Sequence, residues 1–207
     1  MKKLIILLSA LVLMSGAALA QTNDLFISEY IEGSSYNKAV EIYNGTEDAV
    51  DLSQYALVFY FNGNSTGSDL TLDAITLEPG ETFTVVHSSA APELLALANQ
   101  TSGIGSFNGD DVIILEKNGM VIDSMGTLGV DPGVSWSCAE GSTANHTLRR
   151  KNDVCNGDAD ETDSFDICVE WEFLPSDTFD GLGSHDSDCV SVADDTNTWD
   201  SLKALYR

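Results

Sequence analysis

The residues between Asn156 and Asp166 have the types and spacing that most clearly suggest chemistry in this sequence. Four carboxylates stand close together there, at Asp158, Asp160, Glu161 and Asp163. Ca²⁺ takes about six to eight oxygen ligands, and a loop with carboxylates at alternate positions can wrap around one ion. The segment lacks the EF-hand spacing, in which a glycine follows the alternating acidic positions and a glutamate ends the loop. It is therefore the candidate for a calcium site, and a solvated acidic loop is the alternative.

Glu29 and Glu41 are two further carboxylates, and both fall in segments with the alternating pattern of β-strands. If these strands are neighbours, the pair can act as a general acid and base or can hold a cation. A charged group buried without a partner is costly, so a partly buried glutamate more often accepts loop hydrogen bonds or pairs with an arginine. Arg149 and Arg150 are the available partners. We expect a structural role for both glutamates.

The three histidines, His87, His146 and His185, are too far apart in sequence to predict that they meet. No G-x-S-x-G elbow, the strand-to-helix turn that presents a serine nucleophile, is predicted to support a Ser-His-Asp arrangement. We therefore predict no catalytic residues, no enzymatic activity and no required cofactor, with Ca²⁺ as an optional ion. His185 is expected to form hydrogen bonds within a glycine-rich closing turn at 177–185.

All four cysteines lie in the last third of the chain, at Cys138, Cys155, Cys168 and Cys189. An even number of cysteines in an exported protein indicates two disulfides, and the sequence leaves three pairings open. We favour Cys155–Cys168, which would close the acidic loop, together with Cys138–Cys189, which would tie the tail to the body. No C-x-x-C spacing is present, so a zinc site of four cysteines is not expected.

Residues 1–20 have the features of a secretory signal peptide. Lys2 and Lys3 precede an apolar stretch, and Ala18-Leu19-Ala20 provides a small-residue cleavage site. A membrane anchor would need about 20 uninterrupted apolar residues, and Ser15 and Gly16 interrupt this stretch. We predict secretion to the periplasm or the extracellular space after cleavage near Ala20, with no membrane span.

The chain is strongly acidic, with 33 Asp and Glu against 9 Lys and Arg. Cleavage after Ala20 would remove two lysines and no acidic residue, which changes the formal charge from −24 to −26. Such a charge repels phosphate groups, so direct binding to nucleic acid is not expected without divalent cations. Solubility in a salty medium and capture of divalent cations are the two interpretations of this acidic surface.

Alternating apolar and polar residues at short intervals predict an all-β fold. The first two strands are expected at Leu25–Ile31, with Leu25, Ile27 and Ile31 on one face, and at Ala39–Asn44. Further strands are expected at 55–62, 70–77, 82–87, 112–117, 120–124, 145–152 and 169–174. Asn118–Gly119 predicts a two-residue hairpin turn, because both residues tolerate a positive φ.

Two short helices complete the expected fold. A helical insertion is predicted at Ser88–Ser102, because Ser89 can cap it and Pro92 suits its first turn. Residues 190–207 are expected to form a linker and a short C-terminal helix, since apolar residues recur there at helical spacing. The predicted organisation is therefore a signal peptide at 1–20, one β domain at 21–189 and this tail.

Several segments together resemble the bacterial lamin tail domain, most closely the copy at the N-terminus of secreted bacterial extracellular nucleases. They are LFISEYIEGSSYNKAVEIYNGT (25–46), NGDD (108–111), KNG (117–119), VIDSMGTLGVDPGVSW (121–136), TLRRK (147–151) and EWEFLPSDTFDGLGSH (170–185). The resemblance spans about residues 23–186 and implies an immunoglobulin-like antiparallel β-sandwich. In those nucleases a large metal-dependent catalytic domain follows, and the residues after His185 are too few for one.

These observations predict a secreted, non-catalytic lamin-tail-like interaction module, with Ca²⁺ as an optional stabiliser. Its partner is expected to be a secreted or cell-surface protein or a polymer of the cell envelope. An exposed sheet edge or a loop end is the expected route of capture. The alternative is an accessory or catalytic component of an extracellular divalent-dependent nuclease.

Overall fold

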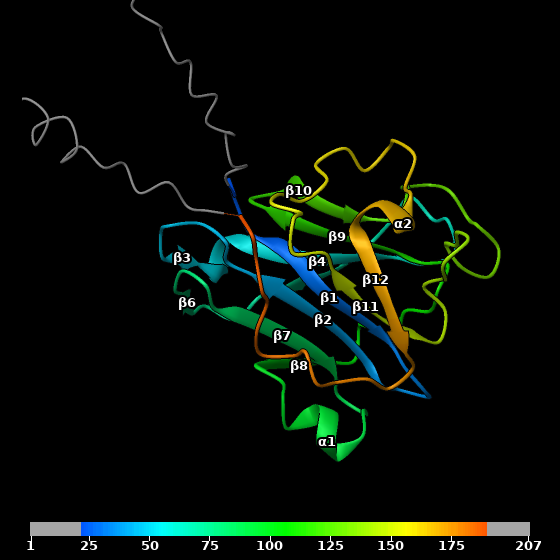
Figure 1. The fold of residues 1–207 in the computed structure, drawn as a ribbon, viewed down its shortest axis with the longest axis horizontal. Helices are drawn as coiled ribbons and strands as arrows, with labels where there is room; N and C mark the ends of the chain where they lie inside the picture. The colour runs from blue at the N-terminus through cyan, green and yellow to red at the C-terminus, as the bar shows by residue number, and fades with distance from the viewer. Residues whose placement is uncertain (1–21, 190–207) are drawn as a thin grey trace, which may run out of the picture.

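The structure is a computed structural model in which residues 22–189 are described. Two main sheets pack face to face, and a third sheet has only two short strands (Figure 1). The predicted signal peptide and the predicted C-terminal helix lie outside the described residues. Within 22–189, no helix is long and apolar enough to cross a membrane. The all-β, immunoglobulin-like sandwich predicted from the sequence is confirmed.

The larger sheet has six strands in the order β12-β11-β1-β2-β7-β8. In chain order these are β1 (Phe26–Glu32), β2 (Lys38–Tyr43), β7 (Thr82–His87), β8 (Gln100–Ser102), β11 (His146–Arg150) and β12 (Trp171–Pro175). All neighbours are antiparallel except β7 and β8, which run parallel. The first two strands of the chain thus form the centre of this sheet.

The second sheet has four strands in the order β10-β9-β4-β5. They are β4 (Tyr55–Tyr60), β5 (Ser68–Thr71), β9 (Val112–Lys117) and β10 (Met120–Met125). β3 (Val50–Asp51) and β6 (Thr76–Leu77) make the small third sheet, and a short 3₁₀ helix, Leu52–Gln54, leads into β4. Asn118 and Gly119 adopt φ of 51° and 75° between β9 and β10, which confirms the predicted hairpin turn.

β1 contains a bulge that reverses its alternation. Ile27 pairs with Ile42 and Glu29 pairs with Glu41, so Ser28 has no residue opposite it. A bulge adds one residue to a strand and shifts every later side chain to the other face. Tyr30 therefore faces the core between the sheets, whereas Ile31 lies on the outer face. The prediction that Ile31 shares a face with Leu25 and Ile27 is wrong for this reason.

The predicted helical insertion is much shorter than expected. α1 spans only Pro92–Leu95, with the proline at its start as predicted, and Ser89 does not cap it. The Asn99 N–H donates to the Thr84 carbonyl at 2.9 Å, and its Oδ1 accepts from the Thr84 N–H at 2.8 Å. These two bonds align the following residues with β7, so the segment continues as β8 instead of helix.

The segment expected to be an irregular loop before the last strand contains a second short helix. α2 spans Ile167–Glu170, and the Asp166 side chain accepts a hydrogen bond from the Cys168 N–H at its start. The last strand therefore begins at Trp171 instead of Val169. This helix places Cys168 and Glu170 beside the end of β11.

The core lies between the two main sheets, and a second apolar cluster covers the outer face of the larger one. Leu25, Ile27 and Tyr30 belong to the first cluster with residues of β4 and β9. The second cluster combines Ile31 with residues of β2, β7, α1 and the segment after β12. The larger sheet is therefore buried on both faces.

Candidate functional site

Residues 177–185, which we call the strap, cover the outer face of the six-stranded sheet. Figure 1 shows this segment in orange, running from the end of β12 back across β2 and β7. Leu182 and Phe179 pack into the outer apolar cluster. The Asp177 carboxylate accepts hydrogen bonds at 2.9 Å from the Ser34 N–H and from Asn37 Nδ2. The strap is thus anchored to the loop between β1 and β2.

Glu29 and Arg149 form an ion pair that joins the sheet to the strap. Glu29 is 1% exposed, and its Oε2 accepts a hydrogen bond from Arg149 Nε at 2.8 Å. Arg149 also donates to the Asp180 carboxylate of the strap at 2.7 Å. Burial raises the pKa of Glu29 to about 7, while the contact with Arg149 opposes the rise. The structural role expected for Glu29 is confirmed, with Arg149 as its partner.

Glu41 lies opposite Glu29 on the same covered face, and hydrogen-bond donors surround its carboxylate. Oε1 accepts from the Ser28 hydroxyl at 2.8 Å, and Oε2 accepts from the backbone N–H of Gly183 at 2.6 Å. Burial raises the pKa of Glu41, and these donors oppose the shift. Because the strap covers both glutamates, the arrangement holds the strap and leaves no open acid–base pair.

Arg150 pairs with neither Glu29 nor Glu41 and forms the centre of a second buried ion cluster. Its side chain is fully buried and donates to Asp123 at 2.5 and 3.2 Å and to Glu170 at 2.5 Å. The guanidinium lies over the rings of Phe26 and Trp171, 5.6 and 4.9 Å from their centroids. Asp123 was not recognisable from the sequence, because one acidic residue in an alternating strand is ordinary.

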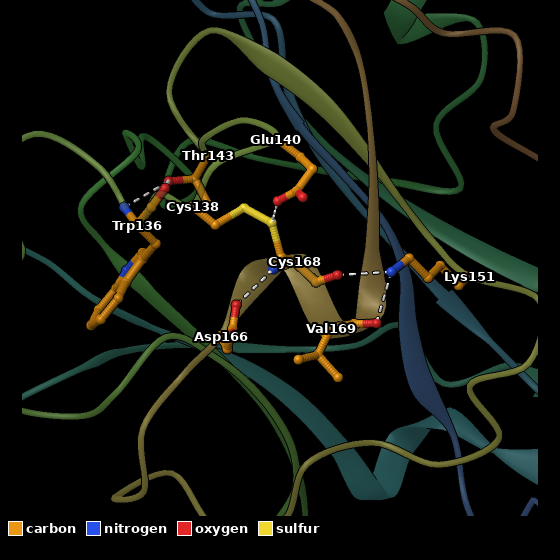
Figure 2. The surroundings of a disulfide bond; sticks show 8 residues. All are labelled: Trp136, Cys138, Glu140, Thr143, Lys151, Asp166, Cys168 and Val169. Atoms are coloured by element: carbon orange, nitrogen blue, oxygen red, sulfur yellow. Dashed lines mark hydrogen bonds between the residues drawn. A yellow bond between two sulfur atoms is a disulfide. The ribbon is translucent and has the colours of Figure 1, made fainter.

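The cysteine pairing differs from the one we favoured. The bonds are Cys138–Cys168 and Cys155–Cys189, with Cα–Cα distances of 6.0 and 5.5 Å. Lys151, directly after β11, donates to the carbonyls of Cys168 and Val169 in α2 at 2.8 and 2.9 Å, as Figure 2 shows. The pairing Cys155–Cys168 is therefore wrong: the two cysteines are close in sequence, but each bonds to a cysteine 30 or 34 residues away.

The acidic loop is ordered by hydrogen bonds between its own side chains and backbone. The Asp158 N–H donates to Asp123 Oδ1 at 2.9 Å, which ties the loop to the Arg150 cluster. Asp158 Oδ1 accepts from the Asp160 N–H, and Asp160 Oδ1 accepts from the N–H and hydroxyl of Thr162. Burial raises the pKa of Asp158, whereas Thr162 lowers that of Asp160.

The four candidate calcium ligands are not assembled around one point. No three of Asp158, Asp160, Glu161 and Asp163 bring one carboxylate oxygen each to within 4.8 Å of one another. Within the described range, the only group that brings three such atoms within 4.8 Å consists of Cys138, Glu140 and Cys168. The sulfurs of Cys138 and Cys168 are bonded to each other in a disulfide. Figure 2 shows the Glu140 carboxylate against this disulfide. The calcium site therefore stays a prediction.

A depression of about 380 Å³ lies between the acidic loop and α2. It is lined by four carboxylates and two apolar side chains: Asp158, Asp163, Asp166, Glu170, Phe165 and Val169. Val169 is 64% exposed, whereas Phe165 packs edge-on against Trp136 at 5.6 Å. We call this feature the acidic depression. Its lining combines negative charge with apolar side chains and contains no histidine or cysteine.

The histidines have separate surroundings. His87 Nε2 lies 3.0 Å from the Ser106 hydroxyl, and its ring stacks on Tyr36. His146 Nδ1 lies 2.8 Å from the Ala144 carbonyl. His185 instead packs against the rings of Phe26 and Tyr43. Its Nε2 is buried without a hydrogen-bond partner, so this atom does not make the hydrogen bond that we expect of His185.

One G-x-S-x-G spacing does occur, at Gly63–Gly67. It lies in the turn between β4 and β5, which pair with each other as antiparallel neighbours. A nucleophile elbow requires a strand followed by a helix. Ser65 therefore lies on an exposed hairpin turn and not in the strand-to-helix turn that presents a serine nucleophile.

The profile of the Lamin Tail Domain family matches residues 18–129, which is more than half of the sequence. The chain belongs to the lamin tail domain family. The matched range includes β1 to β10, and with them Glu29, Glu41 and the bulge of β1. No curated protein matches the sequence. Lamin tail domains are immunoglobulin-like, in agreement with the sandwich described above, and the family suggests an interaction module.

The last third of this lamin tail domain lies beyond the matched range. It contains β11, β12, the strap, both disulfides and the acidic depression. β11 and β12 nevertheless complete the sheet that β1 begins, since β11 pairs with β1 along Glu29, Tyr30 and Ile31. The features beyond residue 129 are therefore built onto the sheet that the matched range begins.

Proposed function

We propose that this lamin tail domain is an exported, non-catalytic interaction module that binds a secreted or cell-surface protein or a polymer of the cell envelope. The acidic depression is the observation that best supports a specific contact surface. It combines four carboxylates with the exposed side chain of Val169, and so offers both charge and apolar contact. A basic side chain with a long apolar stem, such as lysine or arginine, fits this combination.

The surroundings of the acidic depression favour a preformed binding surface. The Cys138–Cys168 disulfide and Lys151 hold α2 on one side. On the other side, the Thr127 hydroxyl donates to the Asp163 carbonyl at 2.8 Å and accepts from the Phe165 N–H at 3.2 Å. A surface that is already ordered loses less conformational entropy when a partner binds.

The sheet edges offer less support for partner capture. Gly157 lies against the Ile122 carbonyl of β10, and Gly141 lies against the Phe173 ring of β12. These loops cover parts of the two longer edge strands, and the other two edges, β5 and β8, are only four and three residues long. Short or covered edges resist pairing with another chain. We therefore place the partner at the loop end instead of at an edge.

Ca²⁺ is proposed as an optional ligand of the acidic loop. Because its carboxylates are not assembled in advance, the loop would have to rearrange to bring several oxygens to about 2.3–2.6 Å from the ion. Such rearrangement weakens binding, so millimolar affinity, which is common for extracellular calcium sites, is the range to test.

A fluorescently labelled tetra-arginine peptide tests the proposed surface by anisotropy on the mature chain. Replacing Asp158 and Asp163 by Asn is expected to weaken binding at least about tenfold, which corresponds to about 1.4 kcal/mol. The matched control replaces Glu93 by Gln and Asp69 by Asn, which removes the same charge from α1 and β5. Equal weakening in both double variants would show that the peptide follows net charge alone, and would refute the proposed site.

The alternative of an extracellular nuclease component has a separate test. The mature chain is incubated with DNA in the presence of Mg²⁺ and Ca²⁺, beside a variant in which Glu29 and Glu41 are both replaced by Gln. We expect no cleavage by either protein, since the strap covers both carboxylates. Turnover by the unaltered chain that the variant lacks would favour the nuclease instead.

A further inference from the structure

Every basic side chain in the described residues has a partner within the domain. The sequence contains nine lysines and arginines, of which Lys2 and Lys3 belong to the predicted signal peptide. Five more lie in the described range, and each forms an ion pair or donates hydrogen bonds there: Lys38, Lys117, Arg149, Arg150 and Lys151. The remaining two, Lys203 and Arg207, lie in the tail at 190–207, outside the described residues.

The acidic depression has carboxylates without such partners. Glu170 pairs with Arg150, but within residues 22–189 no lysine or arginine pairs with Asp158, Asp163 or Asp166. These three carboxylates line the depression together with Val169, which is 64% exposed. The depression therefore suits a segment that carries basic and apolar side chains together.

Residues 201–207 (SLKALYR) carry this combination. They contain Lys203 and Arg207 with two leucines and a tyrosine, and no acidic residue. The acidic residues of the tail, Asp194, Asp195 and Asp200, all precede this stretch. On the helix predicted for the tail, Lys203 and Arg207 are four residues apart and so lie on one face. This stretch is thus complementary to the depression in charge and in apolar character.

The tail leaves the described domain close to the depression. Cys189 is bonded to Cys155, with 5.5 Å between their Cα atoms. Asp158 follows Cys155 by three residues, which span at most about 11 Å. Lys203 follows Cys189 by 14 residues, which reach about 20 Å either as a helix or as a coil. Lys203 can therefore reach the depression without any change in the domain.

We propose that the tail of the same chain docks on the acidic depression through Lys203 and Arg207, and that an external partner must displace it. This inference rests on the proposed function, because it assigns a competitor to the same surface. Leu202 and Tyr206 are next to the two basic residues in the sequence and would cover Val169. The chain thus carries its own weak ligand, and the tail regulates access to the depression.

The length of the connection sets how strongly the tail competes. A linker of this length gives its end a local concentration in the millimolar range. A tail contact with a dissociation constant of about 0.5 mM would then occupy about two thirds of the depressions. The apparent affinity of an external partner falls by the fraction left free, which is about threefold here.

A thermodynamic cycle with the labelled tetra-arginine peptide tests this competition on the mature chain. Lys203→Gln with Arg207→Gln should tighten peptide binding at least about threefold, because the depression is then free. The same pair should change binding by less than about 1.5-fold when it is combined with Asp158→Asn and Asp163→Asn. Both steps change the net charge equally, so a difference between them reports contact between the tail and the depression. Equal tightening in the two backgrounds would overturn the proposal.

Amide shifts measured without peptide separate this proposal from the proposed function. The mature chain is compared by ¹⁵N NMR with its Lys203→Gln, Arg207→Gln variant. We expect the largest shifts within the domain at Asp163, Phe165 and Asp166, and we expect them to fade in about 0.5 M NaCl, which screens the contact. Unchanged shifts there would overturn tail docking even if the peptide binds the depression. Shifts there without peptide binding would instead refute the proposed function and leave tail docking in place.

Cross-linking identifies which chain supplies the tail. A carbodiimide joins a lysine amine to a carboxylate in contact with it, with loss of water. We expect Lys203 to be linked to Asp158, Asp163 or Asp166 in the monomer, and Lys203→Arg to abolish the link while keeping the charge. Links to these residues found only in dimers would assign the tail to a second copy and would overturn the proposal.

Discussion

Replacing Arg150 by methionine is the sharpest test of what stabilises the sandwich. The side chain is fully buried and pairs with Asp123, which is 1% exposed, and with Glu170. Removing one member of a buried ion pair leaves an uncompensated charge and typically costs about 3–5 kcal/mol. Two hydrogen bonds to Asp123, from the N–H groups of Ile27 and Asp158, remain in the variant. We therefore expect a loss of about 3–4 kcal/mol.

Arg149 provides the matched control, because it directly precedes Arg150 on β11 and also pairs with a buried carboxylate, that of Glu29. Its side chain is 30% exposed, and its partner Glu29 has a pKa of about 7. Glu29 can therefore take up a proton when Arg149 is lost, which limits the cost of Arg149→Met to about 1–2 kcal/mol.

Urea denaturation at pH 7 with both disulfides intact measures the two losses as free energies of unfolding. The reasoning predicts a clearly larger loss for Arg150→Met than for Arg149→Met. If Arg150→Met stays within about 1 kcal/mol of the unaltered chain, the buried cluster does not contribute as argued. Equal losses for the two variants would also refute the distinction.

Three further predictions follow from the same geometry. The melting temperature should rise in millimolar Ca²⁺ and lose this response when Asp158 and Asp160 are replaced by Asn; no rise in the unaltered chain removes the calcium proposal. Peptide mapping without reduction should recover Cys138 linked to Cys168, and replacing both by serine should lower the free energy of unfolding by about 2–4 kcal/mol, whereas recovery of another pairing contradicts the structure. Glu29→Gln should flatten the fall in stability expected as the pH rises through about 7, because the folded state holds a proton there that the unfolded state releases. Urea denaturation from pH 6 to 8.5 measures this, and an unaltered chain whose stability does not fall over that range would contradict it.

The sequence predicted the parts of the fold that depend on local pattern. Alternation located β2, and Asn118–Gly119 located the hairpin after β9, because a type I′ turn requires the positive φ that these residues tolerate. The pattern did not reveal the bulge at Ser28, since a bulge is defined by the residue opposite it on another strand.

The parts that depend on contacts far apart in sequence were not predictable. Cys138 bonds to Cys168, 30 residues away, and no spacing in the sequence encodes that contact. Asp123 and Arg150 are 27 residues apart, and Glu41 and Gly183 are 142 apart. The acidic loop was found from composition alone, whereas its separation into individually hydrogen-bonded carboxylates required the structure.

The strap shows why two glutamates are tolerated in the centre of the sheet. Their charges would be costly in an apolar face, but Arg149 and the Gly183 N–H reach them from β11 and from the strap. The family match includes Glu29 and Glu41 but ends before these partners. The glutamates and the strap therefore form one structural unit that a reading of residues 18–129 alone would miss.

An NMR titration of the ¹⁵N-labelled mature chain with tetra-arginine peptide tests most directly the claim that this lamin tail domain binds its partner through the acidic depression. We predict that the largest amide shifts fall at Asp163, Phe165, Asp166 and Val169, and that they saturate. Shifts that are larger at the edges β5 and β8, or that spread evenly over the acidic surface without saturation, would contradict the claim.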